Sequence, residues 1–115
     1  MNKGPLSTQS IDFAIDVVNY YKWLVSDKKE YVMSKQLLKS GTSVGANIHE
    51  ADFAVSKADF ISKMQIALKE LAETEYWLIV LERTGYLPAE QCFLKEKCMS
   101  IKRMLIASLN TSKNG

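Results

Sequence analysis

A short stretch rich in small residues, residues 40–51, holds the side chains best suited to chemistry. Asn47 and Glu50 are three positions apart, so a helix through this stretch places them on one face. A buried amide or carboxylate must find a hydrogen-bonding partner, and Asn47 can donate to a carboxylate. The pattern predicts the polar crossing point of a helical bundle, where small residues let a second backbone come close.

Metal binding is an alternative chemistry for this stretch. Di-iron bundles use one Glu from each of two helices and a Glu-x-x-His motif from each of the other two. The single histidine of the chain, His49, directly precedes Glu50. Adjacent residues of a helix point about 100° apart, so these two side chains do not converge on one ion. We therefore expect no metal and no cofactor.

Nucleophilic catalysis would need a base beside a reactive thiol or hydroxyl. The chain offers Cys92 and Cys98 but neither a second histidine nor a Gly-rich phosphate loop, so we expect a protein that is not an enzyme. The two cysteines are separated by about 9 Å along a helix, too far for a disulfide there. Two free thiols fit a reducing compartment, and we expect a cytoplasmic protein.

Composition favours a single helical domain over residues 1–115 with no membrane partner. The chain has 115 residues, 47% of them hydrophobic, with only two prolines and five glycines, which suits long helices. The N-terminus lacks an apolar signal core, and the longest apolar run, residues 76–81, is far short of the roughly 20 residues that a membrane-spanning helix needs. The formal net charge of +2 is too small to indicate a nucleic-acid binder by itself.

Apolar residues recur at spacings of three and four along most of the chain, which predicts helices. We expect four of them, at about residues 8–26, 29–54, 57–84 and 88–111. Short connections between such helices favour an all-α, antiparallel, up-down-up-down four-helix bundle.

Two helices have clear apolar stripes. In the first helix we expect the buried residues to be Ile11, Ile15, Val18, Tyr21 and Val25. The third helix has the strongest pattern, a bundle seam through Phe60, Met64, Ala67, Leu71, Thr74, Leu78 and Leu81. Ser56 is the expected cap of this helix.

Two glycines, Gly41 and Gly45, fall inside the second predicted helix. Each glycine in a helix costs about 0.5–1 kcal/mol relative to alanine, so a reason for their presence is needed. They mark either a break in the helix or a close contact with another helix. We expect the close contact.

Three segments carry a resemblance to a known family: residues 43–51 (SVGANIHEA), 56–61 (SKADFI) and 67–78 (ALKELAETEYWL). Together they resemble the bacterial four-helix-bundle family also called the 23S rRNA intervening-sequence proteins. The resemblance implies an antiparallel bundle that assembles as a ring, typically a homopentamer. It extends to the accessory bundle proteins of diversity-generating retroelements, which implies contact with RNA or DNA, or with a protein that handles nucleic acid. No catalytic residue is established for the family.

The resemblance adds a third polar residue to the two described above. Asn47, Glu50 and Glu73 match recurrent polar positions of the family. Such residues form either a ligand or partner site, or a buried hydrogen-bond network that fixes the register of the helices. We predict the structural network.

A basic surface is predicted on the last helix. Lys95 and Lys102 are seven residues apart and share a face, with Arg103 beside them. This cluster is either an ordinary solvated face or a phosphate-binding surface, which a ring would strengthen because neutralised phosphates add up around its axis. The leading hypothesis is accordingly a non-enzymatic, self-assembling bundle that scaffolds contact with RNA, DNA or a nucleic-acid-handling protein.

A second surface is predicted on the third helix, where Tyr76, Trp77 and Val80 lie partly off the seam. They belong either to the outer core or to a subunit contact, since interfaces favour Trp and Tyr. A purely protein-binding or structural oligomer without nucleic acid is the alternative function. A small-molecule or metal-binding bundle is a third, and it would need a polar pocket around Glu50 and Glu73.

Overall fold

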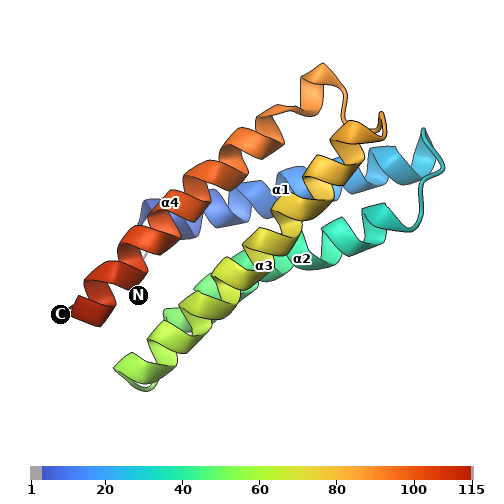
Figure 1. Ribbon diagram of the computed structural model, residues 1–115. Helices are drawn as coiled ribbons and strands as arrows, with labels where there is room; N and C mark the ends of the chain where they lie inside the picture. Colours follow the sequence, from blue (N-terminus) through green and yellow to red (C-terminus); the bar gives the residue numbers. More distant parts are fainter. Residues whose placement is uncertain (1–3, 115) are drawn as a thin grey trace.

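Helices make up most of residues 4–114, the part of the chain that this computed structural model describes. They are α1 (Pro5–Ser26), α2 (Met33–Ala51), α3 (Lys57–Arg83) and α4 (Phe93–Asn114), with a short 3-10 helix, η1 (Ala89–Gln91), before α4. None of the described residues forms a strand, so the all-α prediction is confirmed. Figure 1 shows the four long helices packed along one common direction, with the chain turning at alternating ends. Within residues 4–114, no helix has the length and hydropathy that crossing a membrane requires.

The longest helix, α3, follows its sequence pattern closely. Ser56 caps its start, because the Ser56 hydroxyl accepts a hydrogen bond from the backbone N–H of Asp59 at 3.0 Å. The buried residues of α3 are Met64, Ala67, Leu71, Thr74, Leu78 and Leu81. This is the predicted seam except at its first position, since Phe60 is only half-buried. The regular spacing of three and four residues between apolar positions therefore predicted correctly which residues of α3 face the core.

In α1 the buried stripe differs from the predicted one. The buried residues are Ser10, Phe13, Val17, Tyr20 and Leu24. The predicted stripe is wrong: Ile11 and Ile15 are 53% and 54% exposed, and Val18, Tyr21 and Val25 are only half-buried. Both stripes are apolar, but the observed one contains two aromatic rings, which bury large areas when they enter a core. As a consequence, α1 presents a second apolar stripe to the outside.

The start of α2 is set by a side chain that precedes it. Glu30 accepts hydrogen bonds at 3.2, 3.1 and 2.7 Å from the backbone N–H groups of Val32, Met33 and Ser34. These groups have no partner within a helix that begins here, so the carboxylate satisfies them. Lys29 adopts a left-handed conformation, with φ of 54°. The helix therefore begins at Met33 rather than near residue 29.

The two glycines of α2 lie against α1, and the helix is continuous through both. A Cβ atom on Gly41 would lie 3.0 Å from each of the two Cγ methyls of Val17. A Cβ atom on Gly45 would lie 3.2 Å from the backbone oxygen of Ser10. The absence of side chains thus lets the two backbones approach, which confirms the expected close contact.

Polar contacts attach the last part of the chain to α1. The hydroxyl of the buried Tyr20 donates to the backbone oxygen of Tyr86 at 2.7 Å. Ser100 donates to the Gln9 side chain at 3.3 Å. Along these contacts the residue numbers rise on α1 while they fall on the later segment. The predicted fourth helix begins as the 3-10 turn η1 after Pro88, and α4 itself begins at Phe93.

Candidate functional site

Of the two polar residues predicted on α2, Asn47 is half-buried and Glu50 is exposed, and neither belongs to the core. The Asn47 amide donates to the backbone oxygen of Ser43 at 2.9 Å, one turn earlier on the same helix. Glu50 is exposed and forms an ion pair with Lys63 of α3 at 3.2 Å. An exposed pair of this kind stabilises a protein by about 0–1 kcal/mol at most. Of these two contacts, only the Glu50–Lys63 pair joins α2 to α3, and it does so weakly.

The third predicted polar residue, Glu73, is also exposed. Its carboxylate accepts a hydrogen bond from the indole N–H of Trp77 at 3.2 Å. No hydrogen bond joins Glu73 to Asn47 or Glu50 among the described residues. The buried network predicted from these three residues is therefore wrong, because each side chain finds a nearer partner or faces solvent.

Two hydroxyl groups occupy the buried polar position instead. The Oγ1 atom of Thr74 on α3 lies 2.9 Å from Oγ of Ser40 on α2, and both side chains are buried. The same hydroxyl is 2.8 Å from the backbone oxygen of Glu70, and Ser40 Oγ is 3.4 Å from that of Leu37. Among the described residues, every buried side-chain oxygen or nitrogen has a partner. Thr74 is a polar residue at a position of the predicted apolar seam, and this feature of the sequence could have indicated the pair.

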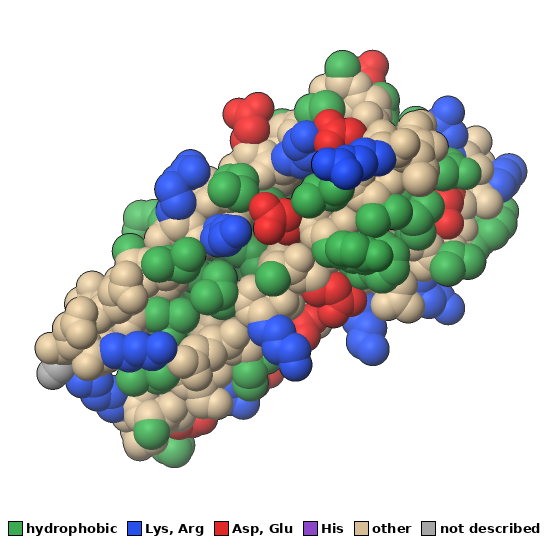
Figure 2. Space-filling view, in the orientation of Figure 1, with side chains coloured by type: hydrophobic (Ala, Val, Ile, Leu, Met, Phe, Trp, Pro, Cys, Tyr) green, Lys and Arg blue, Asp and Glu red, His purple; other side chains and the backbone are tan. Residues whose placement is uncertain are grey.

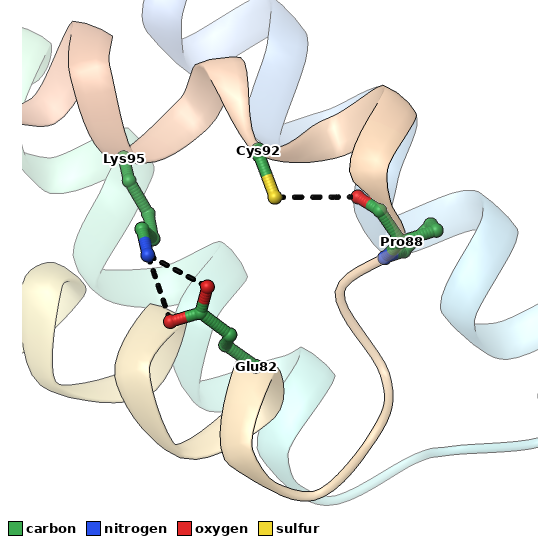
Figure 3. A network of polar contacts seen from close by, with 4 residues as sticks. All are labelled: Glu82, Pro88, Cys92 and Lys95. Carbon is green, nitrogen blue, oxygen red and sulfur yellow. Dashed lines mark hydrogen bonds and ion pairs between the residues drawn. The ribbon is translucent and has the colours of Figure 1, made fainter.

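The basic residues predicted on α4 are largely paired with acids of α3. Lys95 contacts both carboxylate oxygens of Glu82 at 2.8 and 2.7 Å (Figure 3). Lys102 lies 3.6 Å from a carboxylate oxygen of Glu75. Arg103 is exposed and forms no ion pair within residues 4–114. Figure 2 shows Lys and Arg side chains on this face mixed with acidic and hydrophobic ones.

A third lysine fastens α4 to α1. Lys97 forms an ion pair with Asp16, and its ammonium group lies 5.4 Å from the ring centroid of Phe93. Three lysines of α4 thus meet acids on both neighbouring helices. A phosphate group would compete with these carboxylates. Half-exposed ion pairs contribute little free energy, so the exchange of a carboxylate for a phosphate costs little.

The aromatic residues predicted as a contact divide between core and surface. Tyr76 is 57% exposed, whereas Trp77 is half-buried and packs against the core. The two rings meet edge to face, with centroids 4.9 Å apart. Val80 is half-buried. Tyr76 is accordingly the member of this group that is most available to a partner.

An apolar cleft of about 230 Å³ lies between α3 and α4. It is lined by Glu75, Leu78, Ile79, Lys95, Cys98 and Met99. Burial raises the pKa of the Cys98 thiol to about 12, so the thiol stays protonated near neutral pH and is a poor nucleophile. The other cysteine, Cys92, donates its S–H to the backbone oxygen of Pro88 at 3.6 Å (Figure 3).

Across residues 4–114, no group of three His, Cys, Asp or Glu side chains is placed to hold a metal ion. The protein offers a cleft with apolar walls, a partly neutralised basic face and an exposed apolar stripe on α1.

Comparisons with known proteins identify a family and a related crystal structure. A family model described as the 23S rRNA-intervening sequence protein matches residues 6–107. A crystal structure from Bacteroides thetaiotaomicron, described as a protein with unknown function from the S23 ribosomal protein family, is 51% identical to this chain with a TM-score of 0.88. The match covers 90% of this chain and 97% of that one. No curated protein matches the chain. Neither match names an enzymatic activity.

Proposed function

The chain belongs to the family of 23S rRNA-intervening sequence proteins, and on that premise we propose that it is a non-enzymatic cytoplasmic scaffold for RNA. In this proposal the antiparallel four-helix bundle assembles with copies of itself into a ring, with the homopentamer as the expected size. Each copy presents the α4 face that carries Lys95, Lys102 and Arg103. The partner is RNA, DNA or a protein that handles nucleic acid, and RNA is the one that we put to the test.

The shared face of the α4 cations is the observation that supports RNA binding. Lys95 and Lys102 are held by carboxylates of α3 in half-exposed ion pairs, which are worth about 0–1 kcal/mol each. A phosphate can replace a carboxylate at that cost, and a ring repeats the site around its axis. Affinity should then depend on salt, because every neutralised phosphate releases counterions.

Exposed hydrophobic side chains support self-assembly. They lie on three of the helices and include Ile11, Ile15, Tyr76, Ile79, Phe93, Met99 and Ile106. A soluble chain that exposes contiguous apolar surface usually covers it with a partner. Native mass spectrometry and light scattering at micromolar concentration measure the assembly directly, and a monomer would overturn the ring.

The RNA proposal is tested by fluorescence anisotropy with a labelled RNA hairpin at several salt concentrations. The variant Lys95→Gln with Lys102→Gln should bind less tightly, and its salt slope should fall by roughly 0.7–0.9 per lysine. The matched control is Lys39→Gln with Lys69→Gln, which removes two exposed lysines from α2 and α3 and should bind as the parent protein does. Equal binding by both double variants would overturn the α4 surface.

A structural oligomer without nucleic acid is the second candidate function. The internal pairing of Lys95 with Glu82 and of Lys102 with Glu75 favours it, because paired lysines offer less free positive charge. Assembly without salt-dependent RNA binding would support this candidate.

A further inference from the structure

Two apolar surfaces without an observed partner lie on different parts of the chain. The first is the outer stripe of α1, where Ile11 and Ile15 are both more than half exposed. These residues are four apart and so stand one above the other on the helix. The side of α1 that bears Phe13 and Val17 faces the core. The two isoleucines therefore cannot reach the interior of their own chain.

The second surface is the α3–α4 cleft, whose apolar walls include Leu78, Ile79 and Met99. Its volume of about 230 Å³ is below the roughly 300–1,000 Å³ of typical small-molecule sites. The size suits protein side chains better than a cofactor. In Figure 2, which views this face, hydrophobic side chains run along the region between α3 and α4.

The charges at the rim of the cleft narrow the choice of occupant. Glu75 and Lys95 line the cleft, but each already has an ion-pair partner in its own chain. Arg103 lines an adjoining hollow with Lys95, Glu96 and Met99 and has no such partner within residues 4–114. The cleft therefore suits an apolar group accompanied by a carboxylate.

The outer stripe of α1 has this composition. Asp12 is three residues before Ile15 and so flanks the stripe on its α4 side, where it lines a hollow with Gln9, Lys97 and Ile101. It is exposed and forms no ion pair in the described part of the chain. One copy of the protein thus carries two isoleucines and an unpaired carboxylate on one surface, and an apolar cleft with an unpaired guanidinium on another.

We infer that Ile11 and Ile15 of one copy dock in the α3–α4 cleft of the next copy, where Asp12 pairs with Arg103. This inference rests on the proposed self-assembly and identifies its two contact surfaces. Because the surfaces differ, the contact is heterologous, and a pair of copies keeps one free cleft and one free stripe for further copies. Such a contact closes into a ring when the rotation between copies allows it. Arg103 is used by the neighbour and Lys95 lines the occupied cleft, so Lys102 is the member of the three that stays outside this contact.

The test uses one variant for each surface. Ile15→Glu places a charge in the stripe and Met99→Glu places one at the cleft, and both positions are exposed enough for the chain to fold, as circular dichroism should verify. Each variant alone should be monomeric by light scattering at a concentration where the parent protein assembles. The control Ile66→Glu changes an exposed isoleucine outside both surfaces and should assemble normally.

A mixture of the two variants tests the direction of the contact. The intact stripe of Met99→Glu should dock in the intact cleft of Ile15→Glu, so native mass spectrometry should detect heterodimers and nothing larger. Reversal of one charge by Asp12→Arg should weaken assembly, and Arg103→Asp in the same chain should restore it.

The possible failures are distinguishable. Normal assembly by Ile15→Glu or by Met99→Glu would overturn these contact surfaces and leave self-assembly intact. The absence of heterodimers from a mixture of folded variants would likewise overturn the heterologous contact. A monomeric parent protein would overturn both this inference and the proposed ring.

Discussion

Thr74 Oγ1 lies 2.9 Å from Ser40 Oγ, and the pair joins α3 to α2 inside the core. Each hydroxyl also has a backbone oxygen of its own helix nearby, so the removal of one partner leaves the other only partly satisfied. We expect Thr74→Val and Ser40→Ala each to lower the free energy of unfolding by about 1 kcal/mol.

The double variant separates this bond from the other effects of the two substitutions. Once both hydroxyls are gone, no polar atom is left without a partner, so the combined loss should be smaller than the sum by at least about 0.5 kcal/mol. Urea denaturation of the four proteins measures the coupling. Strict additivity would mean that the two hydroxyls do not stabilise each other.

Gly41 depends on the close approach of Val17. Alanine should improve helix propensity by about 0.5–1 kcal/mol, but its Cβ would lie 3.0 Å from both Val17 methyls, and no rotation of one methyl relieves both contacts. Overpacking of this kind costs about 1–3 kcal/mol, so Gly41→Ala should lower the midpoint of thermal unfolding. In a Val17→Ala background the same change should be neutral or stabilising, and an equal cost in both backgrounds would contradict the crowding.

Glu30 acts as the cap of α2. Glu30→Ala should lower the free energy of unfolding by about 0.5–2 kcal/mol, the range for lost helix caps. The amides of Met33 and Ser34, which donate to this carboxylate, should exchange faster with solvent. Glu96→Ala, at an exposed acid in the first turn of α4, is the matched control and should leave those amides unchanged.

The stability of the protein should fall at alkaline pH through Cys98. Burial raises the pKa of this thiol to about 12 in the folded chain, with a smaller contribution from Glu75. The unfolded chain therefore loses its thiol proton first, and stability present below about pH 9 is lost as the pH rises toward 12. Burial also raises the pKa of Tyr20, which adds to the loss at higher pH.

Between pH 9 and pH 10, the change in stability should come mainly from the Cys98 thiol. The free energy of unfolding should drop by about 1 kcal/mol over this range, and Cys98→Ala should remove most of this slope even though its overall stability is lower. Cys92→Ala leaves Cys98 in place and should keep the slope. Parallel pH profiles for the parent protein and Cys98→Ala would show that another group is responsible.

The sequence pattern was sufficient where one apolar stripe was longer and more regular than any other on the helix. In α3, the positions from Met64 to Leu81 kept an unbroken spacing of threes and fours, and Ser56 fixed the start of the helix by its own hydrogen bond. In α1, two apolar stripes shared the same spacing, so periodicity could not choose between them. The packing of Phe13 and Tyr20 against other helices decided the register.

The polar residues were harder to place because residue type alone does not tell which partner a side chain finds. Asn47 and Glu50 share a helical face, as expected, but that face lies outside the core: Glu50 is exposed, and the half-buried Asn47 donates to the backbone of Ser43 on the same helix. Serine and threonine can enter the core more cheaply, since their hydroxyls bond to the preceding turn. Ser40 and Thr74 did so.

The acceptor of the Tyr20 hydroxyl lies 66 residues further along the chain. Because a ribosome adds residues one at a time from the N-terminus, α2 and α3 must be synthesised before that acceptor exists. A nascent chain therefore cannot finish the packing of its first helix until translation has passed Tyr86.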